Sequence, residues 1–92
     1  MRRIERTTQF RRDYKRIRRG RLRPKLEEHL GSVLALLVTD QPLPARYVDH
    51  ALVGQWNGFR DCHVFPDLVL IYEKPDDVLR LIRLGSHSDL SM

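Results

Sequence analysis

The sequence has little that would mark a secreted or membrane-embedded protein. Its 92 residues include one cysteine, Cys62, so an internal disulfide cannot form, and a lone thiol fits a reducing compartment. No apolar run approaches the roughly 20 residues that span a bilayer. The residues after Met1 are arginines and are not followed by the apolar core of a secretion signal. We therefore expect a cytoplasmic protein that does not insert into a membrane.

Motifs for metals and nucleotides are missing as well. The chain has no H-E-x-x-H motif, no paired cysteines and no glycine-rich phosphate loop, the patterns by which such sites are usually identified. Three histidines and an aspartate form an alternative metal-binding set, but they are not closely spaced on one element. Cys62 alternates away from His63 along a predicted strand, so we expect a buried thiol rather than a nucleophile. The sequence predicts neither a metal nor a cofactor.

Positive charge is concentrated at the start of the chain. Residues 1–25 hold 12 lysines and arginines against 2 acidic residues, a local charge of +10, whereas the other 5 basic and 10 acidic residues sum to −5. A basic block of this kind favours a polyanionic partner, most simply a nucleic acid, because neutralising phosphates releases condensed counterions. A well-solvated helix surface is the alternative explanation.

The hydrophobic pattern changes from helical to alternating along the chain. Residues 2–7 alternate as a first strand, and Gly20 separates two helices, the second of which begins at Pro24 and ends before residues 42–44. The apolar stripes are Phe10, Tyr14 and Ile17 in the first helix and Leu26, Leu30, Val33, Leu34 and Leu37 in the second. Alternating runs near residues 50–55, 58–65, 68–73 and 78–84, with turns at Pro66-Asp67 and Pro75-Asp76-Asp77, predict strands.

These elements predict one α+β domain over residues 1–92. An N-terminal strand and a two-helix hairpin are expected to pack on a largely antiparallel sheet of four to five strands. A chain of 92 residues suffices for one modest core but not for a separate substrate domain. Any active site should therefore be shallow.

Acid–base groups gather in the second half of the chain. The candidate catalytic residues are His50, His63, Asp67, Arg83 and His87. Histidine exchanges protons near neutral pH, and a guanidinium can bind charge that develops on a phosphoryl oxygen. Cleavage of RNA through its own 2′-hydroxyl needs no metal, so such a set suffices. A single histidine is more commonly structural, and we assign that role to His29 on the second helix.

Alternation predicts which of these side chains share a face. Phe59, Asp61, His63 and Phe65 are expected on one face of their strand, and Leu79, Leu81 and Arg83 on one face of the last strand. Arg83 would then terminate an apolar row beside flexible Gly85 and His87. This placement favours a pocket at the strand ends.

Several segments together resemble the YafQ branch of the RelE/ParE toxin superfamily. They are Pro42-Leu43-Pro44-Ala45, the run from Asp49 to His63, Pro66-Asp67-Leu68-Val69-Leu70-Ile71-Tyr72 and Arg83-Leu84-Gly85-Ser86-His87-Ser88. Residues 8–16 are similar to the family's first helix, so the resemblance covers essentially the whole chain. It implies a RelE-like fold.

The resemblance further implies a type II toxin, an mRNA interferase that enters the ribosomal A site and is neutralised by a cognate antitoxin. By position, His87 is the general acid, Arg83 the phosphate stabiliser, and Asp67 with His50 or His63 the base and orienting groups. The side chains expected to contact ribosomal RNA are Arg11, Arg12, Lys15, Arg16, Arg18, Arg19 and Arg60. The expected partners are the ribosome, mRNA and an antitoxin whose acidic segment orders on binding. We expect a monomer when free and a hetero-oligomer with the antitoxin.

Two positions depart from the branch, in which a tryptophan commonly follows the Pro-Asp pair and a phenylalanine lies near the end. This chain has Leu68 and Ser91 there, so we expect weaker stacking on a splayed base. Two alternatives remain open. A ParE-like toxin would share the fold and poison DNA gyrase without catalytic histidines, and a noncatalytic RNA- or antitoxin-binding module would need only the basic helices.

Overall fold

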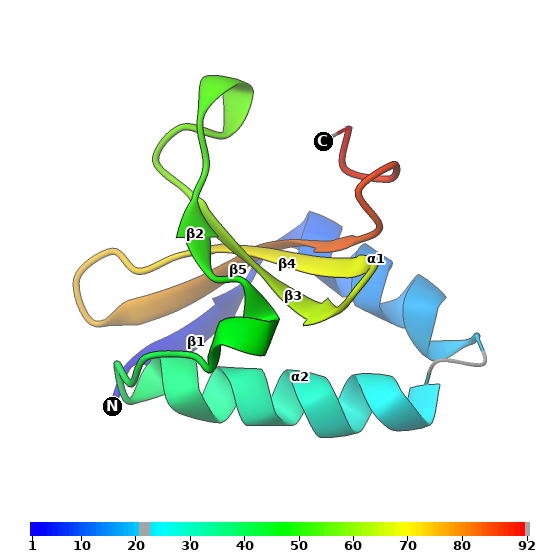
Figure 1. The fold of residues 1–92 in the computed structure, drawn as a ribbon, viewed down its shortest axis with the longest axis horizontal. Coiled ribbons are helices and arrows are strands. Elements are labelled where there is room, and N and C mark those ends of the chain that lie inside the picture. The colour runs from blue at the N-terminus through cyan, green and yellow to red at the C-terminus, as the bar shows by residue number, and fades with distance from the viewer. Residues whose placement is uncertain (21–22, 92) are drawn as a thin grey trace.

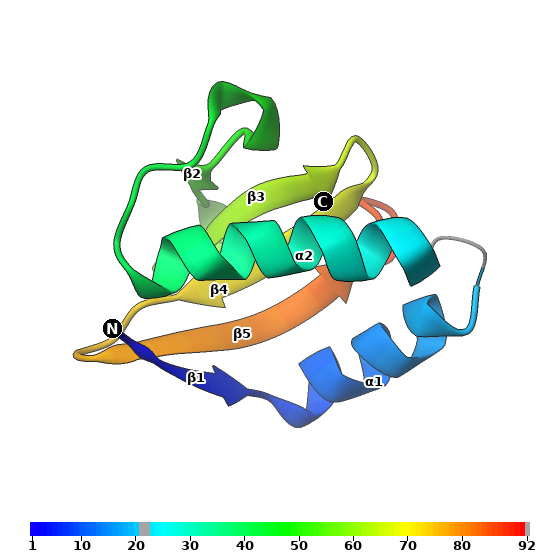
Figure 2. The ribbon, with the colours of Figure 1, turned by 90° about the horizontal axis from the view of Figure 1, so that it is seen from below.

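Two helices cover one face of a five-stranded sheet in this computed structural model, which describes residues 1–20 and 23–91 (Figures 1 and 2). The elements are β1 (Arg3–Arg6), α1 (Thr8–Arg18), α2 (Arg23–Val38), β2 (His50–Ala51), β3 (Arg60–Phe65), β4 (Leu68–Glu73) and β5 (Val78–Gly85). The strand order is β1-β5-β4-β3-β2, and every pair is antiparallel except β1 with β5. The predicted fold class is confirmed. None of the described helices combines the length and apolar character needed to span a bilayer.

The main core lies between the helices and the sheet. The predicted apolar stripe of α2 is buried, with Leu34 only partly so, and it packs with Phe10 of α1 against the sheet. The sheet side chains in this cluster include Cys62, Leu70, Tyr72, Leu79, Leu81 and Leu84. Burial of such aliphatic and aromatic side chains is the dominant stabilising contribution to folding.

Capping by Thr7 sets where α1 begins. Its hydroxyl accepts a hydrogen bond from the Phe10 amide at 3.0 Å and donates one to the Ile82 carbonyl of β5 at 2.7 Å. The first hydrogen bond satisfies a backbone amide that has no partner within the helix. The second hydrogen bond connects the start of the helix to the sheet. The last turn carries Lys15, Arg16 and Arg18, which suit the negative end of the helix dipole.

The strand predicted over residues 50–55 is much shorter than expected. Only His50–Ala51 pair with β3, and a 3₁₀ turn follows at Gly54–Trp56. Gly54 has a φ of +68°, a backbone conformation that residues other than glycine rarely adopt. The chain therefore leaves the sheet at this point.

Two register shifts correct the predicted side-chain faces. Between His63 and Phe65 the pairing of β3 with β4 skips a residue, so Phe65 packs with the main core instead of sharing the face of His63. Opposite Ile71 and Tyr72, β5 has an extra residue, so Leu84 rather than Arg83 continues the row of Leu79 and Leu81. The predicted faces of Phe65 and Arg83 are therefore wrong, because bulges interrupt strict alternation.

Candidate active site

The sheet face opposite the helices carries the candidate site. A second cluster lies there, built on buried Val69, Ile71 and Leu90. Figure 1 shows the segment after β2 and the C-terminal segment on this side of the sheet, away from α2. Because β3 alternates, Asp61 and His63 point to this face while Cys62 points to the helices.

One row of paired residues crosses four strands at the site. His50 pairs with Asp61, Asp61 with Ile71, and Ile71 with Arg83. Residues paired in this way have side chains on the same face, and neighbouring strands lie about 4.8 Å apart. His50, Asp61 and Arg83 therefore share the open face, with the buried Ile71 between the last two.

Asp61 is a buried carboxylate beneath His50. Its residue is 1% exposed, and its Oδ1 lies 3.1 Å from His50 Nδ1. Nδ1 also lies 2.9 Å from the Val48 carbonyl oxygen, and Oδ1 receives no well-aligned hydrogen bond from the described residues. We therefore place the Nδ1 proton on the bond to Val48 and treat the Asp61 contact as electrostatic. Burial raises the pKa of Asp61, and the charges of the nearby histidines oppose that rise.

His87 and Asp67 form a second imidazole–carboxylate pair. His87 Nδ1 lies 3.1 Å from Asp67 Oδ1, and the His87 amide lies 3.4 Å from the same oxygen. The hydrogen bond from the His87 ring, followed by the one from its amide, lowers the pKa of Asp67. An ionised carboxylate only accepts, so the ring must donate from Nδ1. This leaves Nε2 for proton exchange.

His63 stands next to this second pair. The centroids of its ring and the His87 ring are 5.0 Å apart, with the ring planes at 79°. His63 also lies two residues beyond Asp61 on β3, a spacing of about 7 Å along a strand. The three histidines therefore occupy one face, with His63 adjacent to His87.

A tight turn after β5 positions His87. The Ser86 amide donates to Asp89 Oδ2 at 3.2 Å, and the Asp89 amide donates to the Ser86 hydroxyl at 3.0 Å. Gly85 permits this turn, because a Cβ there would lie 3.1 Å from the Asp89 Cβ. Leu90 is buried on the open-face cluster and fastens the end of the turn.

Arg83 is held by a buried carboxylate on α1. Its Nε donates to Asp13 Oδ2 at 2.8 Å and its Nη2 to Oδ1 at 3.3 Å, while the Leu84 amide donates to Oδ2 at 3.0 Å. Hydrogen bonding to Asp13 raises the pKa of Arg83. The guanidinium is fixed in place and carries further N–H donors that Asp13 does not use.

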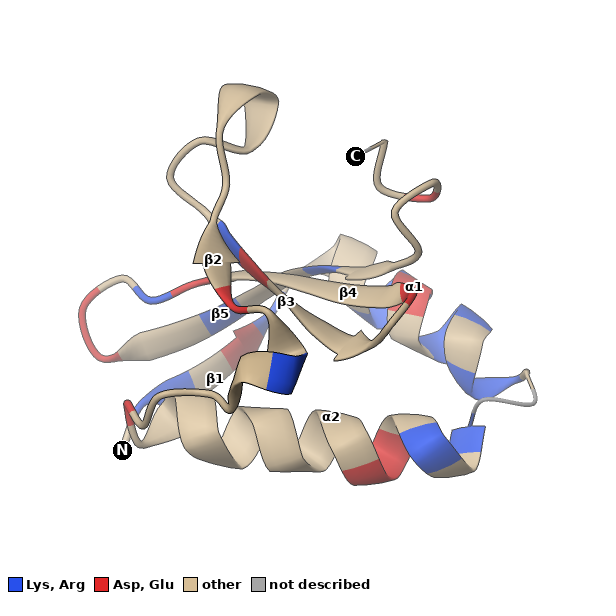
Figure 3. Ribbon diagram, in the orientation of Figure 1, with Lys and Arg blue, Asp and Glu red and all other residues tan. Residues whose placement is uncertain are grey.

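The predicted RNA-contacting side chains fall into two groups. All of those on or just after α1 are exposed, and Figure 3 colours the lysine and arginine positions of the ribbon blue. Of these, Arg16 pairs with Asp13 and Asp89, at 3.8 and 3.4 Å. Arg60 instead pairs with Asp49 at 3.3 Å and has its Cα opposite Tyr72, a core residue. Its side chain therefore alternates away from the histidine face.

Neither a nucleophilic cysteine nor a metal cluster is present in the described residues. Cys62 is fully buried, as predicted, and burial raises the pKa of its thiol. Residues 1–20 and 23–91 contain no group of three histidine, cysteine, aspartate or glutamate side chains arranged to hold a metal ion. The chemistry on the open face is that of imidazoles, carboxylates and one guanidinium.

Comparison with known families identifies the family of this chain. The family described as bacterial toxin of type II toxin-antitoxin system, YafQ, matches residues 2–92. The chain belongs to the YafQ toxin family. The mRNA interferase toxin YafQ of Escherichia coli K12 is 42% identical over 88 residues, which cover 95% of this chain and 92% of that protein.

Solved structures of bacterial toxins share the fold. YafQ in the E. coli DinJ-YafQ toxin-antitoxin complex is 42% identical, with a TM-score of 0.82 over 97% of this chain and 96% of that one. A copper-bound mutant toxin from Helicobacter pylori is 37% identical, with a TM-score of 0.91 over 98% and 99% of the two chains. The predicted family is confirmed.

In this YafQ-family toxin, the structure brings most of the predicted site residues together. His63, Asp67 and His87 are in mutual proximity, while His50 and Arg83 occupy the row that also contains Asp61. Asp61 was not among the predicted catalytic residues, although its place two residues before His63 was a usable signal. Its burial could not be read from the sequence, because it depends on the turn segments that fold over the sheet.

Proposed function

We propose that this toxin is a metal-independent endoribonuclease that cuts mRNA at the ribosome and so inhibits translation. The observation that carries the proposal is the pair of imidazole–carboxylate contacts, His50 with Asp61 and His87 with Asp67, on one sheet face beside His63. The activity named for the E. coli relative, mRNA interferase, supports it.

The proposed reaction places the scissile phosphate over His63, between the two pairs. In-line attack by the 2′-oxygen requires a base on one side of the phosphorus and an acid on the other. His50 takes the 2′-hydroxyl proton, and the buried Asp61 stabilises the positive charge that then forms on the ring, since attraction is stronger in a low dielectric. His87, held by Asp67, gives a proton from Nε2 to the leaving 5′-oxygen.

Arg83 is proposed to bind the charge on the phosphoryl oxygens. Asp13 holds its Nε and one Nη group, so its remaining N–H groups are available to the substrate. A fixed donor needs little reorganisation as charge develops, which is how such groups stabilise a transition state. His63 lies between acid and base and is proposed to orient the phosphate.

The proposed setting is cytoplasmic. The exposed basic side chains of α1 would contact ribosomal RNA, and the E. coli DinJ-YafQ complex supports an antitoxin partner for this chain. We expect the free toxin to be monomeric, and we expect no metal or cofactor.

Primer extension on a defined message in a purified translation system tests the proposal. Wild-type protein should produce cuts that depend on ribosomes, and His87→Ala should lose them while its circular dichroism spectrum stays unchanged, because the ring is 40% exposed. Folded wild-type protein that makes no cuts would contradict the proposal. That result would favour a gyrase-directed toxin or a noncatalytic binding module.

A further inference from the structure

A groove lies beside the active site, on the other side of β3. The groove lies between α1, the start of α2 and the turn from β3 to β4. Its volume of about 770 Å³ is within the range of roughly 300–1,000 Å³ that is typical of small-ligand pockets. His63 and Asp67 also line it. The groove is therefore continuous with the candidate active site.

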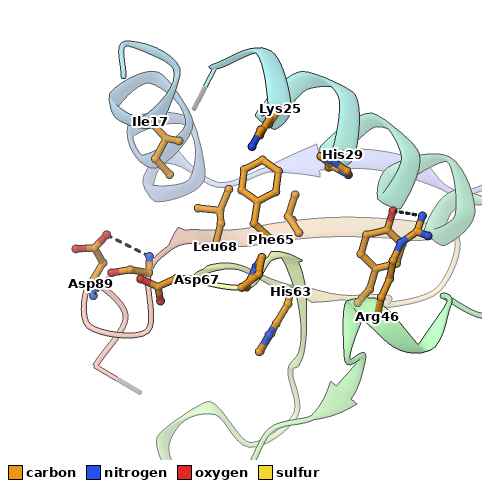
Figure 4. A pocket seen from close by; sticks show the side chains of 13 residues that line it. Ile17, Lys25, His29, Arg46, His63, Phe65, Asp67, Leu68 and Asp89 are labelled. Atoms are coloured by element: carbon orange, nitrogen blue, oxygen red, sulfur yellow. Dashed lines mark hydrogen bonds between the residues drawn. The ribbon is translucent and has the colours of Figure 1, made fainter. Parts of the chain in front are cut away.

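An aromatic ring lies in this groove. Phe65 is half-buried, and its ring centroid lies 5.2 Å from that of His29, with the planes at 84°. The register shift after His63 places it here, and Figure 4 shows Phe65 and His63 pointing to opposite sides of the strand. Ile17 and Leu68 add apolar surface around the ring. The floor thus suits a flat, apolar group.

Two basic side chains at the groove have no carboxylate partner among the described residues. Lys25 and Arg46 both line it, and neither is ion-paired with a described carboxylate, while Arg46 lies over the Tyr47 ring at 4.8 Å. The two lining carboxylates are already engaged, Asp67 by His87 and Asp89 by Arg16. The groove therefore combines an aromatic floor with two cations that pair with no described carboxylate, although Arg46 also donates to the Tyr47 hydroxyl at 3.1 Å.

We propose that this groove binds the nucleotide next to the scissile phosphate of the RNA substrate. The base stacks on Phe65, and Lys25 and Arg46 contact flanking phosphates, as in single-strand sites that join aromatic platforms with basic side chains. The substrate would pass over the turn at Pro66-Asp67, from the histidine face into the groove. This inference rests on the proposed nuclease function.

Binding of a hexanucleotide with 2′-O-methyl riboses tests the groove, since this RNA has no attacking hydroxyl. We expect chemical-shift changes at the amides of Lys25, His29 and Phe65 in the isotope-labelled wild-type protein. Phe65→Leu, which keeps an apolar side chain but removes the ring face, should weaken binding about tenfold. Phe59→Leu, the same change on the open-face cluster, should alter it less than about twofold.

The outcomes separate this inference from the proposed function. Shift changes confined to the open face, or equal effects of Phe65→Leu and Phe59→Leu, would overturn the groove site even if the protein cuts mRNA. Groove amides that respond to an acidic antitoxin peptide but not to RNA would also overturn it. Conversely, RNA binding in the groove by a protein that makes no cuts would support the groove as an RNA-binding site and would contradict the proposed nuclease function.

Discussion

At the scale of single residues, the carboxylates of the site differ in environment and should respond oppositely to pH. Asp61 is buried with a raised pKa, whereas Asp67 is exposed with a lowered pKa. A raised folded-state pKa means that ionisation costs stability as pH rises, and a lowered one means that ionisation adds stability. The two positions therefore provide a matched comparison.

Asp61→Asn should make the protein more stable than wild type at about pH 7, because it removes a buried charge. The gap in unfolding free energy should shrink as pH falls, because wild-type Asp61 takes up its proton in the folded state before the unfolded chain does, and it should vanish below the unfolded-state pKa of about 3.9. Asp67→Asn should have the opposite effect: its unfolding free energy should be lower than that of wild type at neutral pH, and this difference should shrink as the pH falls. Urea denaturation at several pH values measures both, and a gap for Asp61→Asn that is independent of pH would contradict the assignment. Cleavage should fall in both variants.

Val48 holds a strained backbone next to His50. Its φ is +49°, and a β-branched residue in the left-handed region is an outlier whose strain costs about 1–3 kcal/mol. Val48→Gly should raise the unfolding free energy by about 1 kcal/mol, net of the entropy that glycine loses. Val53 is also exposed but has an ordinary φ of −127°, so Val53→Gly should destabilise. Equal effects of the two changes would show that Val48 is not strained.

At the scale of elements, α2 contains an unneeded glycine. Gly31 lies inside the helix, and a Cβ there would meet nothing within 4 Å. Gly31→Ala should stabilise the protein by about 0.5–1 kcal/mol because alanine favours the helix. Gly54 has equally open surroundings but a φ of +68°, so Gly54→Ala should destabilise. Thermal unfolding of the two variants would show whether backbone conformation or free space decides the sign.

The helices and β4 were predictable in type and approximate position because their signals are local. Proline, glycine and helical spacing mark α1 and α2, and the predicted strand at residues 68–73 matches β4. The faces of Phe65 and Arg83 were not predictable, since a bulge depends on how two strands pair. The same holds for the parallel pairing of β1 with β5, which joins the two ends of the chain.

At the scale of the whole molecule, the basic surface of α1 should govern binding to RNA. Replacing Arg11, Arg12 and Lys15 with glutamine should flatten the dependence of log Kd on log salt, by about 0.7 for each phosphate of a single strand that the variant no longer neutralises. Arg80→Gln should leave the slope unchanged, because Arg80 is paired with Glu5 and Glu73 at 3.1 and 2.7 Å. Fluorescence anisotropy with single-stranded RNA measures both. An unchanged slope in the triple variant would mean that RNA binds to another surface.

The sequence by itself determined the fold class, the basic N-terminal surface and the set of histidines, because composition, periodicity and motif spacing are properties of the linear chain. Only the tertiary structure decided that Asp61 lies buried beneath His50, that Asp13 on α1 holds Arg83, and that Phe65 faces a groove. Burial, ion pairing across 70 residues and strand bulges depend on which distant segments meet. These features form only when the helices, the sheet, the segment after β2 and the C-terminal segment pack together.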